Sequence, residues 1–447
     1  MAASLLKKLV RTVVPPPDEA ARANRRGLQV INTWRELLSD RGEVSGAAIA
    51  REALAAYGAL DVAHLPYFFA MLAADFTPDE KALRGAAERY LAVPDAANLM
   101  ALQQASASPR QELFRRLNQA AEGTAALVNV RERVQNGLPL NPALGVIDAD
   151  LAHLFNSWFN RGFLTLQRID WRTPAIVLEK LIEHEAVHEI SGWHDLRRRL
   201  QSDRRCFAFF HPALPDEPLI FIEVALVRGI SSAVQPLLDP DAPIADPQRA
   251  DTAVFYSITN CQRGLRGVSF GNLLIKQVAQ RLGEEFPRIK TFSTLSPIPG
   301  FTTWLARSAI DNERLPLANL AGNALRLLSQ KDWHRNVEMA DAMRKDVLPL
   351  CAYYLINARQ DKLPTDPVAR FHLGNGARAE RLNWLADASA RGLKNCAGMM
   401  VNYVYHLDQI EENHEAYVRE HHVAATHELR RMARESTLLH ATPARKK

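Results

Sequence analysis

Residues 291–301 of the chain, TFSTLSPIPGF, place a serine hydroxyl directly after a strand-like run and before two prolines. Pro297 and Pro299 exclude a helix and favour an extended loop at the end of that strand. Ligands commonly bind at the carboxyl ends of strands in an open sheet. The hydroxyl of Ser296, held on such a stiff loop, could therefore be aimed at a substrate. A plain Ser-Pro turn is the alternative.

Two later segments carry further groups that could transfer protons. Residues 366–377, DPVARFHLGNGA, put His372 between apolar neighbours, where its proton would be available near neutral pH. A hydrogen-bonded core histidine is the alternative. Residues 399–405, MMVNYVY, add two phenols on a short apolar stretch. That stretch equally fits a buried strand or helix whose hydroxyls have partners.

A glycine-rich segment, residues 262–274, QRGLRGVSFGNLL, lies between a predicted strand and a predicted amphipathic helix. The free amide groups and the dipole at a helix start favour a bound pyrophosphate. The spacing fits neither a Walker loop nor a dinucleotide fingerprint. It resembles the Arg-Gly-x-Gly-x-Gly/Ala loop by which acetyltransferase-type (GNAT) folds hold coenzyme A, with Ser269 in place of the middle glycine. An ordinary glycine-rich turn is the alternative.

Residues 184–188, HEAVH, match the HExxH pattern of zinc proteases, in which two histidines on one helical face bind the metal. The match stands near the end of a helix predicted to start at residues 173–174. The extended HxxGxxH continuation is absent from the sequence. We therefore expect a solvated helix end here and no metal site.

The surrounding pattern predicts two parts. Residues 18–160 have helical periodicity, with capping signals that begin at Thr77 and at Ser108. After residue 160 the pattern becomes mixed. We expect strands at 206–211, 219–227, 252–258 and 290–295, a helix at 271–285, and mostly helices after residue 303. The predicted fold class is α+β, with a helical domain at 1–160 and a catalytic domain at 161–447.

Composition narrows the class of protein. The chain has 447 residues with 47% hydrophobic and 23% charged, typical of a globular protein with a large core. A net charge of +5 is too small to suggest nucleic-acid binding, although it suits an anionic small molecule. No stretch is apolar enough to span a membrane, and the basic N-terminus lacks the apolar run of a secretory signal. We expect a cytoplasmic protein, with a transit peptide as the alternative. Its thiols are scattered, without metal or disulfide spacing: Cys206, Cys261, Cys351 and Cys396.

The order of these segments is more specific than any one of them. YSITNCQRGLRGVSFGNLLIKQV, TFSTLSPIPGF, PVARFHLGNGA and NYVYHL follow one another along the chain. In this order they resemble the malonyl-CoA decarboxylases, and the resemblance extends over most of the chain. It implies a helical bundle that forms a homo-oligomer, either a dimer or a tetramer. A GNAT-like catalytic domain with added C-terminal helices would follow it. The resemblance also implies that neither biotin nor a metal is needed.

The same resemblance implies roles for individual residues. Ser296 and His372 would be the catalytic pair, joined by a hydrogen bond, and Ser257 and Tyr405 would be supporting catalytic positions. The loop that binds malonyl-CoA would comprise Arg266, Gly267, Val268, Ser269, Phe270, Gly271 and Asn272. Ser269 stands where family members carry a glutamate. Another residue would then supply any carboxylate that is needed, and Glu223 is a candidate.

The implied reaction is decarboxylation of malonyl-CoA to acetyl-CoA and CO2, within malonyl-CoA and fatty-acid metabolism. When CO2 leaves, the thioester carbonyl accepts the electron pair of the broken C–C bond, so no cofactor is expected. Two other functions remain open from sequence. An acyl-CoA N-acyltransferase would share the fold and the loop but would need an acceptor amine. A regulator that binds coenzyme A without turnover would share the loop alone.

Overall fold

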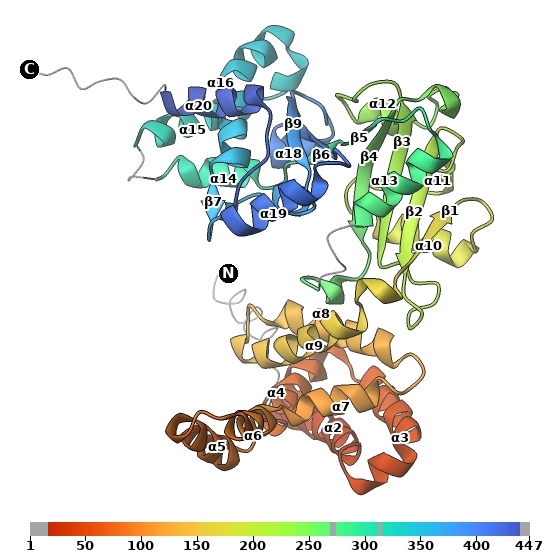
Figure 1. The fold of residues 1–447 in the computed structure, drawn as a ribbon, viewed down its shortest axis with the longest axis vertical. Helices are drawn as coiled ribbons and strands as arrows, with labels where there is room; N and C mark the ends of the chain where they lie inside the picture. Colours follow the sequence, from red (N-terminus) through yellow and green to blue (C-terminus); the bar gives the residue numbers. More distant parts are fainter. Residues whose placement is uncertain (1–16, 269–273, 312–314, 439–447) are drawn as a thin grey trace, which may run out of the picture. The chain divides into compact units, whose positions relative to one another are not determined.

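The computed structural model describes residues 17–268, 274–311 and 315–438 (Figure 1). The chain forms two compact units. The helical unit comprises residues 1–164, 211–215 and 262–270, and the sheet unit comprises residues 165–210, 216–261 and 271–447. Among the described residues, no helix is both long enough and apolar enough to cross a membrane.

The helical unit contains an aromatic core. Trp34 and Phe68 meet edge to face with ring centroids 4.9 Å apart, and both are fully buried. The predicted cap at Ser108 is confirmed, because its hydroxyl accepts the N–H of Arg110. The predicted cap at Thr77 is wrong, because the carboxylate of Asp79 caps the helix instead. The helices are α2 (Pro17–Glu36), α3 (Asp40–Gly58), α4 (Leu65–Asp75), α5 (Glu80–Ala92), α6 (Ala96–Ser106), α7 (Pro109–Leu117), α8 (Gly123–Gly137) and α9 (Gly145–Trp158).

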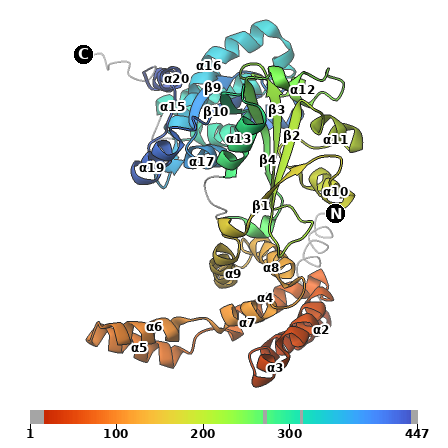
Figure 2. The same cartoon turned by 45° about the vertical axis from the view of Figure 1, so that its right-hand side comes forward.

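The sheet unit contains, within its described residues, an eight-stranded sheet in the order β1-β2-β3-β4-β5-β10-β6, with β9 also paired to β10 (Figures 1 and 2). β4 and β5 are parallel and the other pairs are antiparallel. The strands are β1 (Thr165–Ile169), β2 (Arg204–Phe210), β3 (Ile220–Val227), β4 (Thr252–Asn260), β5 (Thr291–Thr294), β6 (Ser296–Pro297), β9 (Arg378–Asn383) and β10 (Met400–Val404). A small separate hairpin pairs β7 (Arg359–Gln360) with β8 (Leu363–Pro364).

The parallel strands β4 and β5 are joined by a long connection that contains a helix. The chain passes from β4 through the glycine-rich segment and α13 to β5, the crossover that a parallel pair requires. The predicted α+β class, with a helical part followed by a part that mixes strands and helices, is confirmed. The helices of this unit are α10 (Ala175–His184), α11 (Trp193–Arg199), α12 (Gln235–Leu238), α13 (Leu274–Glu285), α14 (Phe301–Ser308), α15 (Leu315–Leu328), α16 (Val337–Ile356), α17 (Pro367–Gly374), α18 (Ala390–Cys396), α19 (Ile410–Glu420) and α20 (His427–Leu438).

Apolar packing fixes the sheet. Leu178 and Leu181 of α10 and Leu196 of α11 pack against Ala208 and Phe221 from β2 and β3 in one buried cluster. β2, β3 and β4 read as nearly continuous apolar runs because almost every residue in them is buried. The sheet is therefore rigid, and the ends of its central strands can hold side chains in fixed positions.

Candidate active site

Ser296 lies where the sheet changes from β5 to β6. Both strands pair with β10, through Val404↔Ser293 and Val401↔Ser296. Prolines at 297 and 299 prevent further strand pairing, and α14 begins two residues after the second one. The Ser296 side chain is buried, with 5% of the residue exposed.

His372 lies in the last turn of the short helix α17. Pro367 occupies the first turn, and the Asp366 carboxylate caps the helix by accepting the N–H groups of Val368 and Ala369 at 2.9 and 2.8 Å. The imidazole is 3% exposed. Burial lowers the pKa of His372 to about 3, because a charged imidazolium would lose its hydration there. His372 is therefore neutral near pH 7.

The two side chains meet. Ser296 Oγ lies 3.0 Å from His372 Nε2, so the expected hydrogen bond is present. The other ring nitrogen, Nδ1, lies 2.8 Å from the Tyr405 hydroxyl. Tyr403, two residues earlier, stacks its ring on the imidazole with centroids 4.6 Å apart. Burial raises the pKa of Tyr405 well above its usual value of 10, so the phenol is protonated in the resting enzyme.

Sequence reasoning did not single out Thr294. Its Oγ1 accepts the Ser296 hydroxyl at 2.9 Å and the Tyr403 backbone N–H at 3.1 Å, and the residue is fully buried. The signal that could have found it is the two-residue spacing, since side chains at i and i+2 of a strand share a face. Thr294 extends the connected polar groups to four side chains.

Asp366 was also missed as part of the site. Beyond capping α17, its carboxylate accepts the Tyr354 hydroxyl at 3.3 Å and the backbone N–H of Gly300. Gly300 belongs to the proline loop that follows Ser296, whereas α17 carries His372. Burial raises the pKa of Asp366 to about 6. One buried carboxylate therefore joins the serine loop to the histidine helix.

Ser257 on β4 lies in a different polar cluster. Its hydroxyl donates to Glu185, with 2.9 and 2.8 Å to the two carboxylate oxygens, and Thr259 donates to the same group at 3.1 Å. Among the described residues, no hydrogen bond joins Ser257 to Ser296 or His372.

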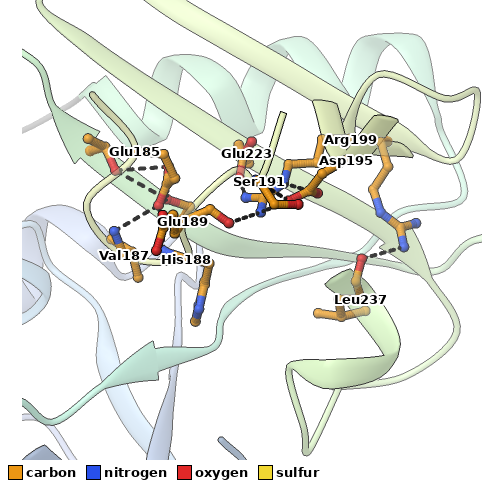
Figure 3. Close-up of polar contacts among 12 residues, drawn as sticks. Glu185, Val187, His188, Glu189, Ser191, Asp195, Arg199, Glu223 and Leu237 are labelled. Carbon is orange, nitrogen blue, oxygen red and sulfur yellow. Dashed lines mark hydrogen bonds and ion pairs between the residues drawn. The ribbon is translucent and has the colours of Figure 1, made fainter. Parts of the chain in front are cut away.

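The expected solvated helix end at residues 184–188 is wrong. α10 ends at His184, so the two histidines of the HExxH pattern do not share a helical face. Glu185 turns inward and accepts the backbone N–H groups of Val187 and His188 at 2.8 and 2.7 Å (Figure 3). Glu185 and His188 are 8% and 7% exposed. Glu185 therefore anchors the turn after α10 to strand β4.

Glu223 was the candidate for a substitute carboxylate in the loop. It lies on β3, 1% exposed, and accepts from Arg199 at 2.9 Å (Figure 3). Arg199 also donates to Asp195 at 2.9 Å. The Glu223 carboxylate therefore forms a buried ion pair. Removing either partner would destabilise the folded protein, because the other charge would stay buried and unpaired.

The predicted coenzyme A loop is described only in its first part. Arg266 and Gly267 are exposed, Val268 is buried, and Gly267 has a left-handed φ of +80° that favours glycine. Just before it, the carbonyl of Gly264 accepts from Arg131 of α8 at 2.8 Å, which fixes the start of the loop. Four predicted loop residues lie outside the described residues: Ser269, Phe270, Gly271 and Asn272.

Two family models match the chain. The malonyl-CoA decarboxylase C-terminal domain matches residues 162–442, and the malonyl-CoA decarboxylase N-terminal domain matches residues 76–159. The mitochondrial malonyl-CoA decarboxylase of Anser anser anser is 36% identical over 347 residues, which are 72% of this chain and 69% of the relative. The mitochondrial malonyl-CoA decarboxylase of Rattus norvegicus is 36% identical over 341 residues, 71% and 69% of the two chains.

Solved structures give the same result. The crystal structure of malonyl-CoA decarboxylase from Rhodopseudomonas palustris is similar with a TM-score of 0.85 and 47% identity, covering 91% of this chain and 99% of the other. That from Agrobacterium vitis is similar with a TM-score of 0.84 and 49% identity, covering 90% and 99%.

Proposed function

The chain belongs to the malonyl-CoA decarboxylase family, and we propose that it converts malonyl-CoA to acetyl-CoA and CO2 at the Ser296–His372 pair. The observation that carries this proposal is the buried 3.0 Å contact between Ser296 Oγ and His372 Nε2. It places a hydroxyl and a neutral imidazole, two proton carriers, side by side in a buried environment.

The reaction requires little beyond positioning. When the bond between C2 and the carboxylate breaks, its electron pair forms an enolate with the thioester carbonyl. The enolate then takes one proton at C2, and acetyl-CoA results. The protein must turn the carboxylate out of the carbonyl plane, stabilise the enolate oxygen and deliver the proton. A hydrogen-bond donor aimed at the enolate oxygen is worth roughly 3–4 kcal/mol in a water-excluded site.

His372 supplies the proton to C2, directly or through Ser296. Because the pKa of His372 is lowered to about 3, the donor is neutral imidazole and not imidazolium. A neutral imidazole suffices because a thioester enolate is a far stronger base than the other groups at the site. General acid catalysis of this kind contributes about 10²–10⁴-fold.

The remaining predicted residues act around this pair. Tyr405 holds His372 through its 2.8 Å contact with Nδ1. Ser257 supports the pair from the neighbouring cluster, in which its hydroxyl donates to Glu185. The loop from Arg266 to Asn272 binds the phosphates of coenzyme A. The left-handed Gly267 and the exposed Arg266 support this assignment.

The domain division, the assembly and the compartment belong to the same proposal. The boundary between residues 160 and 161 separates an oligomerisation domain from the catalytic domain, and the protein is a cytoplasmic homo-oligomer. Exposed apolar side chains on the α5–α6 hairpin, such as Leu91 at 81% and Met100 at 69%, support assembly through the helical part. The four cysteines are free thiols, which suits a reducing compartment.

Incubation of the purified protein with malonyl-CoA alone tests the function. We expect equal amounts of acetyl-CoA and CO2, because no acceptor is needed. An N-acyltransferase would form product only when an amine is added. A coenzyme A-binding regulator would bind malonyl-CoA without turnover. Either of those results would overturn the proposal.

A further inference from the structure

The hydrogen bonds around Ser296 have a direction. A serine hydroxyl carries one proton, and the geometry directs the Ser296 O–H toward Thr294 Oγ1, 2.9 Å away. The same threonine oxygen accepts the Tyr403 backbone N–H at 3.1 Å, so Thr294 is an acceptor on both sides. Once its proton points to Thr294, Ser296 Oγ can only accept from His372 Nε2.

This direction fixes the state of the imidazole. His372 is buried and neutral, so it carries a single ring proton. If that proton is on Nε2, then Nδ1 is bare and accepts from the Tyr405 hydroxyl, 2.8 Å away. Every proton then points the same way, from Tyr405 to His372, to Ser296 and to Thr294.

We propose that Thr294 is a positioning residue: by accepting the Ser296 hydroxyl, it holds His372 as the Nε2–H tautomer and so sets the direction of proton transfer toward the substrate. This inference rests on the proposed function and deepens it, because it assigns Ser296 as the immediate donor to C2. Thr294 itself touches Ser296 and not the reacting carbon.

The transfer balances as follows. CO2 leaves, and the electron pair of the broken bond forms the enolate. Ser296 turns its O–H from Thr294 to C2, where the enolate electrons form the new C–H bond. Ser296 takes the Nε2 proton, and Nδ1 takes the Tyr405 proton. After acetyl-CoA leaves, a proton from solvent water binds Nε2 and the Nδ1 proton returns to Tyr405. Each turnover consumes one solvent proton, as the overall reaction requires.

Valine at position 294 removes the acceptor while keeping the branched shape. In Thr294→Val, Nε2 is the acceptor left to the Ser296 hydroxyl among the described residues, so His372 is expected to change to the Nδ1–H tautomer and to donate to Tyr405. Thr294→Ser retains an oxygen and should retain the wild-type tautomer. Ser293→Ala is the matched control, because it removes the neighbouring buried hydroxyl, which donates to the Thr294 carbonyl at 3.1 Å, without touching Ser296.

The tautomer can be read directly by ¹⁵N NMR of the full-length protein labelled at histidine, with His372→Asn used to assign the His372 signals. We expect Nε2–H in the wild type, in Thr294→Ser and in Ser293→Ala, and Nδ1–H in Thr294→Val. In Thr294→Val, kcat for malonyl-CoA should fall about 100-fold, the low end of a general acid's contribution, while KM changes less than about threefold. Thr294→Ser should restore most of kcat.

Two outcomes would overturn the inference: Nδ1–H in the wild type, or Nε2–H retained in Thr294→Val. If Thr294→Val does not fold, the wild-type spectrum alone still decides the tautomer. Failure of the proposed function looks different, because the wild type would then release no CO2 from malonyl-CoA whatever tautomer His372 adopts.

Discussion

The side chains of Ser296 and His372 meet, with 3.0 Å between Oγ and Nε2, although 76 positions separate them in the chain. Strand β10 brings them together. It pairs with β6 through Val401↔Ser296, and its Tyr403 stacks on the imidazole at 4.6 Å. The pair is thus held by a sheet contact on one side and by a ring contact on the other.

The hydroxyl of Tyr405 should matter for turnover and not for substrate binding. Tyr405→Phe removes the group on His372 Nδ1 but keeps the buried ring. We expect kcat to fall by about 10–100-fold with little change in KM, since the lost interaction serves the proton transfer. Steady-state kinetics with malonyl-CoA measures both. Tyr417→Phe is the matched control, because among the described residues the Tyr417 hydroxyl has no partner. Equal effects in the two variants would contradict the role of Tyr405.

The low pKa of His372 predicts the pH dependence of activity. Because the imidazole is neutral above a pKa of about 3, kcat should show no inflection near pH 6.5 from this residue. Initial rates at saturating malonyl-CoA between pH 5 and 8 provide the measurement. The contrary result is an inflection of kcat near pH 6.5 in the wild type that disappears in Tyr405→Phe, where the environment of the imidazole changes. Such an inflection would belong to His372 and would refute a neutral donor.

The lowered pKa of His372 also predicts how the stability of the protein depends on pH. The folded-state pKa of His372 is lowered, so the unfolded chain binds a proton more readily between pH 6.5 and about 3. Stability from this residue is therefore lost as the pH falls below 6.5, by up to about 1.4 kcal/mol per pH unit. Urea unfolding from pH 7 to pH 5 should show wild type losing stability relative to His372→Asn. Parallel curves for the two proteins would contradict the buried neutral imidazole.

Asp366 should affect both stability and turnover. Asp366→Asn replaces one acceptor oxygen with an N–H₂ group that faces the donors of Tyr354 and Gly300. We expect a loss of roughly 1–3 kcal/mol in unfolding free energy, as for other unsatisfied buried groups. We also expect a lower kcat, because the serine loop and α17 are no longer joined. Asp95→Asn, which alters an exposed helix cap, is the control and should leave kcat unchanged. A wild-type kcat in Asp366→Asn would show that the link does not position the pair.

Ser257 and Glu185 should act as a unit. Glu185 accepts from Ser257, from Thr259 and from two backbone amides, so neither partner can change independently. In a double-mutant cycle of Ser257→Ala and Glu185→Gln, we expect a coupling energy of about 0.5–3 kcal/mol in unfolding free energy. Urea denaturation of the four proteins gives this value. If the losses of unfolding free energy from the two substitutions simply add, the two residues do not act as a unit.

The sequence identified the candidate catalytic residues better than the residues that hold them in position. The prolines around Ser296 and the asparagine-glycine sequence after His372 are local signals, and both segments fold where they were expected. Thr294 and Asp366 act through contacts with β10 and with the Gly300 turn, which arise only when distant segments pair. Glu185 was expected in solvent because its position at a helix end suggested exposure. The structure instead buries it under two β4 hydroxyls.

The strands also differ in whether local sequence reveals them. β2, β3 and β4 were recognisable as apolar runs, since a strand buried on both faces needs apolar side chains throughout. β9, with the sequence RAERLN, has no such signal. Its place in the sheet depends on pairing with β10, whose own sequence fitted either a strand or a helix.

The most direct test of the central claim is turnover of malonyl-CoA by His372→Asn, with coenzyme A binding measured on the same preparation. Asparagine keeps a polar group of smaller volume but cannot relay a proton to Ser296. If His372 is the general acid, kcat should fall by about 10²–10⁴-fold, the contribution of a positioned general acid, while coenzyme A binding stays within about threefold of wild type. Near-wild-type release of CO2 by this variant would contradict it.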